Sequence, residues 1–396
     1  MSKRYLIINT GSASKKYAFY VDEDKLYTAH FEKEAGAFIV TEKIEEENVK
    51  STIDEKTYQR AIEFIINSLL AKNIIKERSD IDLSGIRIVA PGEYFLKNRF
   101  IDEEYLRLAN EALAKVPLHL APALEEISIL REVLGKDHLI VGVSDSSIHA
   151  SIPDSRIYYG IKIADSRSLG LRRFGYHGIS VQSVVRQAEK IIGYLPEKVI
   201  VCHLGGGASI TAVKNGKSVN TTMGFTPLEG LVMATRVGDI DPGAVIYLME
   251  KLGKDESAMG SYFNNECGLL GLSGKSDDIR DLLALEASGD QDSALALEVY
   301  VERIKQNIGR MAASLGGVDL LILAGTVGER SFIMRERICR DLEFLGIRLD
   351  QELNNQSEGV EVSLEKAGEP VKILVVKTDE MSEIAAETLR ISKQDK

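Results

Sequence analysis

A short strand–turn–strand pattern occurs twice in the chain, once near the N-terminus and once near the middle. In the first copy, apolar residues at 5–8 and 17–21 flank a run of small polar residues. In the second copy, apolar residues at 199–202 and 210–213 flank a turn that contains three consecutive glycines. Short apolar runs separated by small turn residues are typical of β-hairpins. The repeat therefore predicts an internally duplicated chain with one such hairpin in each half.

Amphipathic segments alternate with further strand patterns along the chain. Apolar residues recur at the spacing of one helix face over 58–70 and again over 295–315. Apolar runs at 320–323 and 371–376 have the length of buried strands, and Asn215–Gly216 is the dipeptide typical of a type I′ hairpin turn. Strands that alternate with helices predict an α/β protein.

The length of the chain predicts two domains. Its 396 residues exceed the size at which a single core usually keeps growing, and 44% of them are apolar, which is enough for a sizeable core. We expect an N-terminal domain over 1–147 and a C-terminal, nucleotide-binding domain over 148–382. We expect the final helix, over 383–396, to pack back on the first domain.

Charge and cysteine content narrow the class of partners and the compartment. With 49 basic and 60 acidic side chains the net charge is −11, which disfavours nucleic acid and anionic membranes as partners. Cys202, Cys267 and Cys339 are widely spaced and form no C-x-x-C pair, so we expect reduced, buried thiols. The chain shows neither a secretory signal pattern nor an apolar run long enough to cross a bilayer. We therefore expect a cytoplasmic protein.

The stretch over 220–243 has the periodicity of neither a helix nor a strand and is rich in Gly, Thr and Met. Soluble proteins usually devote irregular backbone of this length to a site. The stretch contains one Arg, Arg236, and the carboxylates of Glu229, Asp239 and Asp241 are close enough in sequence to orient it. This composition predicts that Arg236 is aimed at an anion.

The two hairpin turns have the composition of phosphate-binding sites. Small residues let backbone N–H groups approach phosphate oxygens, while hydroxyls and a Lys add donors and charge. Either turn alone is more often an ordinary tight turn, but the recurrence favours binding. One such hairpin in each half, facing a shared cleft, is similar to the way in which the actin, sugar kinase and heat-shock ATPase superfamily holds nucleotide phosphates. No G-x-x-x-x-G-K-[ST] motif occurs, which excludes a P-loop. The candidates are Ser12, Ser14 and Lys16 in the first turn and His203, Leu204, Gly205, Gly206 and Gly207 in the second.

Ordered blocks along essentially the whole chain closely resemble the acetate kinase family. The blocks are INTGSASKKY, RIVAPGE, VPLH, DSSIH, RRFGYHG, HLGGGAS, the 220–243 stretch, CGLLGLSGKSDDIR, AGTVGER, EFLGIRLD and KTDE. The resemblance implies two duplicated actin-like ATPase (ribonuclease H-like) domains that hinge over a nucleotide cleft, and a homodimer. It also implies reversible transfer of a phosphoryl group from Mg-ATP to acetate, giving acetyl phosphate and ADP.

The chemistry that this resemblance implies is mainly electrostatic. Acetate is already ionised at pH 7, so no strong base is needed, and two anions must be brought into line while the charge on the phosphoryl group is neutralised. By the resemblance, Arg87 and Arg236 bind the carboxylate and stabilise the transferring group, and His177 hydrogen-bonds the phosphoryl group. Asp145 matches the family's active-site acid, and we expect it to orient Arg87 or His177. Isolated Arg and His residues are more often structural, but motif placement favours function here.

The resemblance also assigns residues to the metal and to both substrates. Mg²⁺ (or Mn²⁺) usually takes one or two protein oxygens and keeps several waters, and Asn9 and Glu380 match that role. The acetate pocket is expected to be lined by Val89, Leu118, Tyr176 and Pro227, with His119 nearby. The adenosine is expected to contact Asp278, Ile279, Arg280, Thr326, Val327, Gly328, Glu329 and Arg330.

Several residues depart from the family pattern and leave alternatives open. Tyr176 replaces a family Phe, Ala90–Pro91 a His-Gly, Gly206 an Asn, Asn220 an Asp, Thr326 a Gly, Arg330 an Asn and Val181 a His. One alternative is a kinase for propionate or another short acid. A second, suggested by Thr326 and Arg330, is a donor other than ATP, either pyrophosphate or another nucleotide. A third is a nucleotide-binding regulatory protein with impaired transfer. An active carboxylate kinase is favoured because the chain retains all of the residues expected around the transferring phosphoryl group, namely Asn9, Arg87, His177, Arg236 and Glu380.

Overall fold

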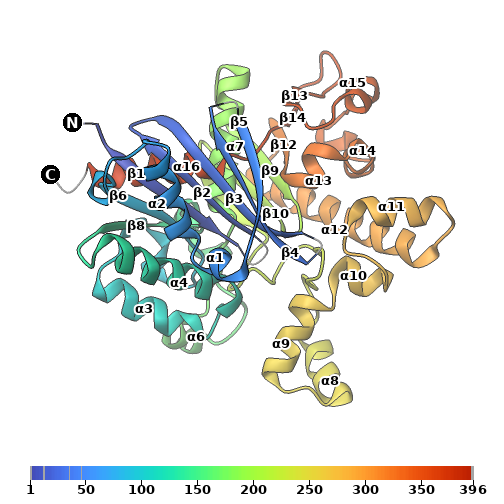
Figure 1. Cartoon of the computed structure of the whole chain (residues 1–396). Helices are drawn as coiled ribbons and strands as arrows, with labels where there is room; N and C mark the ends of the chain where they lie inside the picture. Colours follow the sequence, from blue (N-terminus) through green and yellow to red (C-terminus); the bar gives the residue numbers. More distant parts are fainter. Residues whose placement is uncertain (1, 12–13, 35, 46, 394–396) are drawn as a thin grey trace. The chain divides into compact units, whose positions relative to one another are not determined.

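The computed structural model describes residues 2–11, 14–34, 36–45 and 47–393. The chain divides into two compact units, Met1–Ser147 together with Asp379–Lys396, and Ile148–Thr378. Each unit holds one β-sheet with helices packed against it (Figure 1). The helices of the described ranges include none that is both long and apolar enough to span a membrane.

The described residues of the first unit form an eight-stranded sheet with the order β5-β4-β3-β2-β1-β6-β8-β7. Its strands are β1 (Arg4–Thr10), β2 (Ser14–Val21), β3 (Asp24–Glu34), β4 (Ala37–Ile44), β5 (Glu47–Ile53), β6 (Leu83–Ile88), β7 (Arg99–Phe100) and β8 (Leu139–Ser144). The strands from β1 to β5 form antiparallel pairs, whereas β1, β6 and β8 run parallel. The first predicted hairpin is thus present as β1–β2 and is followed by parallel strands.

Helices cover this sheet and enclose its core. They are α1 (Glu55–Gln59), α2 (Ala61–Ala71), α3 (Glu103–Leu113), α4 (Pro117–Leu134) and α16 (Glu380–Ser392), with short 3₁₀ turns at η1 (Arg78–Asp80) and η2 (Glu93–Leu96). The C-terminal α16 packs on β1, β6 and β8 (Figure 1). Gly85 permits this contact, because a Cβ at that position would overlap the Thr388 hydroxyl of α16. The close packing fixes the start of α16, and hence Glu380, beside the parallel strands.

The prediction of a single helix over 58–70 is wrong in one respect, because the segment forms two helices. Arg60 lies between α1 and α2 with φ −104° and ψ 39°, outside the helical region. Its guanidinium is held by Glu63 and by Glu132 of α4, at 2.6 and 2.7 Å. A long-range ion pair therefore accompanies the break in a segment whose apolar spacing is continuous.

The second unit repeats the order of the first. Its described residues form a six-stranded sheet, β11-β10-β9-β12-β14-β13, with β9 (Lys198–Leu204), β10 (Ala208–Lys214), β11 (Lys217–Thr221), β12 (Leu320–Ala324), β13 (Val362–Ser363) and β14 (Lys372–Val375). The hairpin β9–β10 is antiparallel, and β9 pairs in parallel with β12, as β1 does with β6. Asn215 and Gly216 both have positive φ in the turn between β10 and β11, as a type I′ turn requires.

Helices complete this unit, and only some of them pack on the sheet. They are α5 (Asp154–Ile157), α6 (Ile163–Leu169), α7 (Gly178–Ile192), α8 (Pro242–Leu252), α9 (Glu256–Asn265), α10 (Gly268–Ser273), α11 (Ile279–Ala287), α12 (Gln291–Leu315), α13 (Gly325–Arg330), α14 (Phe332–Cys339) and α15 (Gln351–Gln356), with 3₁₀ turns at η3 (Ser147–Ser151) and η4 (Glu343–Leu345). Valines of α7 join alternate residues of β9 and β12 in one core cluster. The predicted helix over 295–315 is confirmed as part of α12, which also packs on β9 and β10.

All three cysteines are free. Cys202 and Cys339 are buried, and burial raises the pKa of both thiols, that of Cys339 to about 12. Cys267 is only half-buried, so the expectation of three buried thiols is wrong for this residue.

Candidate active site

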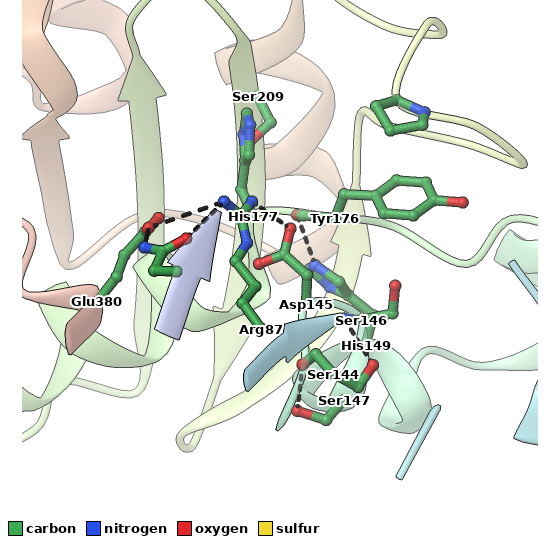
Figure 2. A network of polar contacts seen from close by, with 12 residues as sticks. Arg87, Ser144, Asp145, Ser146, Ser147, His149, Tyr176, His177, Ser209 and Glu380 are labelled. Carbon is green, nitrogen blue, oxygen red and sulfur yellow. Dashed lines mark hydrogen bonds and ion pairs between the residues drawn. The ribbon is translucent and has the colours of Figure 1, made fainter. Parts of the chain in front are cut away.

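Four polar side chains of the first unit meet at the carboxyl edge of its parallel strands (Figure 2). Arg87 Nη2 donates to Asp145 Oδ2 at 2.9 Å, and Arg87 Nη1 lies 3.8 Å from Glu380 Oε2 and 3.4 Å from Asn9 Oδ1. Asn9 Nδ2 in turn donates to Glu380 Oε2 at 2.7 Å. The topology explains this meeting, because Asn9, Arg87 and Asp145 lie at or just beyond the ends of β1, β6 and β8.

The Arg87 guanidinium is held as a cation at this edge. Its side chain is 17% exposed, and that of Asp145 is 1% exposed. Burial opposes the charge of Arg87, but Asp145 and Glu380 together raise the pKa of Arg87 above its usual value. A cation fixed by a buried carboxylate and still partly exposed is suited to bind an anion.

Asn9 and Glu380 have the chemistry that a magnesium ion requires. The pair supplies an amide oxygen and a carboxylate on adjacent elements, β1 and α16. The described ranges hold no group of three or more His, Cys, Asp or Glu side chains that would enclose a metal. Mg²⁺ is usually held by one or two protein carboxylates together with substrate phosphates and water. The residues present therefore fit a metal whose remaining ligands come from substrate.

In the first hairpin, strand alternation separates two neighbouring lysines. Lys16 is exposed on β2, opposite Asn9 in the register, whereas Lys15 is buried and its Nζ lies 2.7 Å from Glu126 of α4. Gly11 N–H donates to the Ser14 carbonyl at 2.9 Å and closes the turn. Ser14 thus begins β2 directly after the turn, Lys16 follows it within the strand, and Ser12 lies outside the described residues.

In the second unit, His177 sits in a backbone conformation that is uncommon for residues other than glycine. It has φ 58° and ψ 20° directly before α7, and its Nδ1 lies 3.0 Å from Ser209 Oγ of β10. His149 Nε2 lies 3.0 Å from the Tyr176 carbonyl, which only accepts, so Nε2 carries the hydrogen. His149 Nδ1 then accepts from Ser218 Oγ at 2.9 Å when the ring is neutral. These contacts hold the turn that presents His177 (Figure 2).

The second hairpin brings His177 and Arg236 together. A Cβ added to Gly207 would lie 3.2 Å from His177 Nε2 and 3.6 Å from Arg236 Nη1. The half-buried His203 ring lies 4.6 Å from the His177 ring, centroid to centroid. Both predicted catalytic residues of this unit therefore border the glycine turn.

The carboxylates near Arg236 in sequence bind other groups, which corrects the expectation that they orient Arg236. Glu229 pairs with Arg173, Asp239 accepts from the Gly230 N–H at 2.9 Å, and Asp241 accepts from the N–H of Gly243 at the start of α8. Arg236 Nη1 itself contacts the Pro227 carbonyl at 3.3 Å.

Arg173, which the sequence did not single out, organises this loop. Its side chain is buried, and its Nη1 donates to the carbonyls of Thr221, Thr222 and Met223 at 3.3, 2.8 and 3.0 Å. These contacts hold an otherwise irregular backbone in one conformation. The sequence offered one indication, since Arg173 lies in the RRFGYHG block that contains His177.

A cavity of about 480 Å³ opens beside the second hairpin within the second unit. Its lining includes most of the predicted adenosine residues, namely Asp278, Ile279, Arg280, Thr326, Val327 and Arg330, together with Gly205 and Gly206 of the second hairpin. Lining residues that the sequence did not single out are Ala234, Leu269, Asp277, Ser331, Phe332, Ile333 and Glu358. Gly328 is instead buried against β12, and Glu329 Oε1 accepts from the Thr378 N–H.

The positive φ at this cavity belongs to Gly325 and not to Thr326. Gly325 has φ 74°, and a Cβ there would lie 2.5 Å from the Leu204 carbonyl oxygen. Thr326 has an ordinary φ and an exposed side chain. The threonine therefore costs no backbone strain.

Comparison with known proteins identifies the family. A family model described as the acetokinase family matches residues 4–386. The chain belongs to the acetokinase family. The acetate kinase of Bacteroides thetaiotaomicron is 37% identical over 401 residues, covering 99% of this chain and 100% of that protein.

Solved structures of the acetokinase family match the fold. The acetate kinase of Porphyromonas gingivalis has a TM-score of 0.87 at 34% identity, covering 98% of this chain and 100% of that chain. A propionate kinase from Francisella tularensis has a TM-score of 0.87 at 32% identity, covering 97% of this chain and 98% of that chain. The expected fold class, α/β of the actin-like ATPase type, is confirmed.

The residues expected at the acyl group lie in both units. Tyr176 is fully buried, and its hydroxyl donates to the Phe225 carbonyl at 2.6 Å. The hydroxyl that distinguishes it from the usual acetokinase Phe is thus satisfied by backbone. Pro227 lies in the same loop as Phe225, whereas Val89 follows β6, and the exposed Leu118 and half-buried His119 lie in the first turn of α4.

Other residues that depart from the acetokinase pattern fit their surroundings in the fold. Val181 packs in the core between α7 and the sheet. Asn220 is buried and bonds Ser314 Oγ and the Thr221 N–H, at 3.0 and 2.9 Å. A Cβ on Gly206 would meet no atom within 4 Å, so the turn has room at this position.

Proposed function

We propose that this protein is an acetate kinase that catalyses reversible phosphoryl transfer between ATP and acetate. The observation that carries the proposal is the cluster at the edge of the first sheet, where Arg87 is fixed by buried Asp145 beside Asn9 and Glu380. A partly exposed cation next to a metal-type oxygen pair is the arrangement needed to join a carboxylate to a metal-bound phosphate. Membership of the acetokinase family supports the same reaction.

The transfer is a direct in-line displacement. An oxygen of acetate forms a bond to the γ-phosphorus, the bond to the β,γ-bridging oxygen breaks, and ADP leaves with the electron pair. Because acetate is already ionised, no side chain has to remove a proton. The side chains therefore act by binding, orientation and charge neutralisation.

We assign roles accordingly. Arg87 binds the acetate carboxylate, and Asp145 positions its guanidinium. Arg236 and His177 donate to the transferring phosphoryl group from beside Gly207. Loss of a transition-state Arg typically lowers kcat by about 10³ to 10⁵.

Asn9 and Glu380 would hold Mg²⁺ (or Mn²⁺). The bound ion would neutralise phosphate charge. The glycine hairpin and the 480 Å³ cavity would hold the nucleotide, with Ser14 and Lys16 adding a hydroxyl and a cation.

We further propose a cytoplasmic homodimer that joins through α8. The helix has no buried residue, and its apolar Ile246, Tyr247 and Leu252 are 69%, 60% and 49% exposed. Apolar surface of this kind on one helix favours a partner with the same surface. Sedimentation velocity of wild type and Ile246→Glu tests this point: a monomeric wild type contradicts it.

The activity is tested by trapping acyl phosphate with hydroxylamine after incubation with Mg-ATP and acetate, propionate or butyrate. Wild type should give acyl hydroxamate, and Arg236→Ala should lose nearly all of it. Arg107→Ala is the matched control, because Arg107 is exposed on α3 and pairs only with Glu104 and Glu111 of its own helix among the described residues. No hydroxamate from any acid would refute the proposal. A larger kcat/KM for propionate would instead support the related propionate kinase activity.

A further inference from the structure

Two arginines, Arg280 and Arg330, line the cavity of the second unit. Arg330 lines the cavity at the end of α13 and is exposed. Within the ranges that the structure describes, its guanidinium makes no hydrogen bond or ion pair. The other cavity arginine, Arg280, is committed to Asp278 through contacts of 2.5 to 3.2 Å. Arg330 is therefore the cavity arginine whose donors are available to a ligand.

The position of Arg330 along α13 separates it from the phosphate-binding turn. The helix begins at Gly325, which packs on Leu204 next to the glycine turn. With a rise of about 1.5 Å per residue, Arg330 lies about 7.5 Å farther along the helix axis than Gly325. With the phosphates on the glycine turn, we infer that the base lies in the part of the cavity that Arg330 lines.

Apolar and acidic side chains line the same cavity. Phe332 and Ile333 follow Arg330 directly, and Ile279 lines the cavity from α11. Such side chains give a planar base an apolar surface to pack on. Asp277 and Glu358 also line the cavity, and both are exposed. The cavity thus combines an apolar surface with guanidinium donors and carboxylate acceptors.

This set of donors and acceptors discriminates between the purines. Guanine presents two acceptors, O6 and N7, on one edge, and an Arg guanidinium matches them with two parallel hydrogen bonds. Its N1–H and 2-amino groups are donors that a carboxylate accepts. Adenine carries an amino group at position 6, so the N–H donors of an Arg would face another donor at this position. The amide of Asn or Gln, which offers one donor and one acceptor, matches adenine instead.

We propose that Arg330 recognises the guanine ring and that the cavity takes guanine nucleotides in preference to adenine nucleotides. The catalytic consequence of this preference rests on the proposed phosphoryl transfer, in which GTP would act as a donor. An acetate oxygen bonds to the γ-phosphorus of GTP, and GDP leaves with the bridging oxygen. Its test does not rest on that transfer, because the base preference is measured by binding.

The experiment is calorimetric titration of the purified wild-type protein with GDP, IDP and ADP, all with Mg²⁺. A bidentate Arg–guanine pair is worth about 5- to 150-fold in affinity, so GDP should bind tighter than ADP by a factor in this range. IDP should share most of this advantage, because hypoxanthine keeps O6 and N7 and lacks only the 2-amino group. The gap between GDP and IDP then measures the contribution of the carboxylates.

Two variants distinguish recognition of the base from non-specific attraction between the Arg330 charge and the nucleotide. Arg330→Asn should reverse the preference and bind ADP tighter than GDP, since its amide matches adenine. Arg330→Met keeps the length without a donor and should bind both alike. Because Arg330 is exposed and its guanidinium has no hydrogen-bond or ion-pair partner among the described residues, neither variant should unfold the protein, and circular dichroism checks this.

The contrary outcomes are distinct. Equal GDP and ADP affinity in wild type overturns the proposal, as does tight GDP binding with IDP as weak as ADP. An equal loss of all three nucleotides in Arg330→Asn shows that Arg330 binds phosphate, including the phosphate of a pyrophosphate donor, and also overturns it. Guanine-selective binding without acyl hydroxamate from GTP or ATP would support the role of Arg330 and refute the kinase function.

Discussion

Replacing Asp145 by Asn tests whether this acid positions Arg87 or acts as a base. Two unit charges about 4 Å apart at an effective dielectric constant near 20 interact by about 4 kcal/mol. Asn keeps the shape and one acceptor oxygen, so we expect a loss near the lower end of the range for a broken buried charge pair, about 2–3 kcal/mol. Each 1.4 kcal/mol is tenfold, which gives a reduction of about 30- to 150-fold in kcat/KM for acetate.

The structure also predicts which kinetic constants of Asp145→Asn change. In wild type, Arg87 Nη1 already lies 3.8 Å from Glu380, so without the charge of Asp145 the guanidinium moves toward Glu380. That shift withdraws Arg87 from acetate and competes with the metal for the Glu380 carboxylate. We therefore expect Asp145→Asn to raise both the KM for acetate and the Mg²⁺ concentration at half-maximal rate.

Initial hydroxamate rates over a range of acetate and Mg²⁺ concentrations, from pH 6 to 8, measure these constants. Asp137→Asn is the control, because Asp137 is exposed in the turn before β8. A variant within threefold of wild type would refute the positioning role. A loss confined to kcat, with a changed acid limb of the pH profile, would show instead that Asp145 transfers a proton.

Two further predictions concern single positions with built-in controls. Gly207→Ala should lower kcat/KM at least tenfold with little change in melting temperature, because its Cβ would lie 3.2 Å from His177 Nε2. Gly160→Ala is the control and should behave as wild type, because Gly160 is exposed, lies outside the cavity lining, and a Cβ there would meet no atom within 4 Å. Equal kinetics for both variants would contradict the placement of His177. Lys15→Met should lower the free energy of unfolding by about 3–5 kcal/mol at pH 7, since it leaves the buried Glu126 carboxylate unpaired. Burial already raises the pKa of Glu126, so the folded state binds its proton more readily than the unfolded state, and the loss should shrink as the pH falls toward 5 in chemical denaturation. A loss that grows at low pH would contradict this reasoning.

Local sequence patterns were sufficient to predict the strands and the turns of the site. The two hairpins, the type I′ turn at Asn215–Gly216 and the helix over 295–315 each depend on residues close in sequence. Most of the residues named for the adenosine also line one cavity, because they follow strand or helix ends whose boundaries are readable. Local patterns predict these features because local contacts determine them.

The sequence does not reveal which partner a charged side chain selects. Glu229 is close to Arg236 in the chain, yet it pairs with Arg173, which reaches the same loop from another segment. Lys15 and Lys16 are adjacent, but one is buried against Glu126 and the other is exposed, and only the register of β2 decides between them. Such pairings are long-range and depend on packing that periodicity does not encode.

The repeated topology explains how one arrangement of strands supports two kinds of chemistry. In each unit, the first strand of the hairpin pairs in parallel with a later strand, as β1 does with β6 and β9 with β12. At that edge the first unit carries Arg87 and Asn9, whose charge and oxygen atoms suit an anion and a metal. The second unit carries Gly205 and Gly325 there, and a Cβ on Gly325 would lie 2.5 Å from the Leu204 carbonyl oxygen, so only glycine lets α13 begin this close to the hairpin. The glycines at one edge therefore leave room for the proposed nucleotide site, while polar side chains at the other carry the charge that the proposed phosphoryl transfer requires.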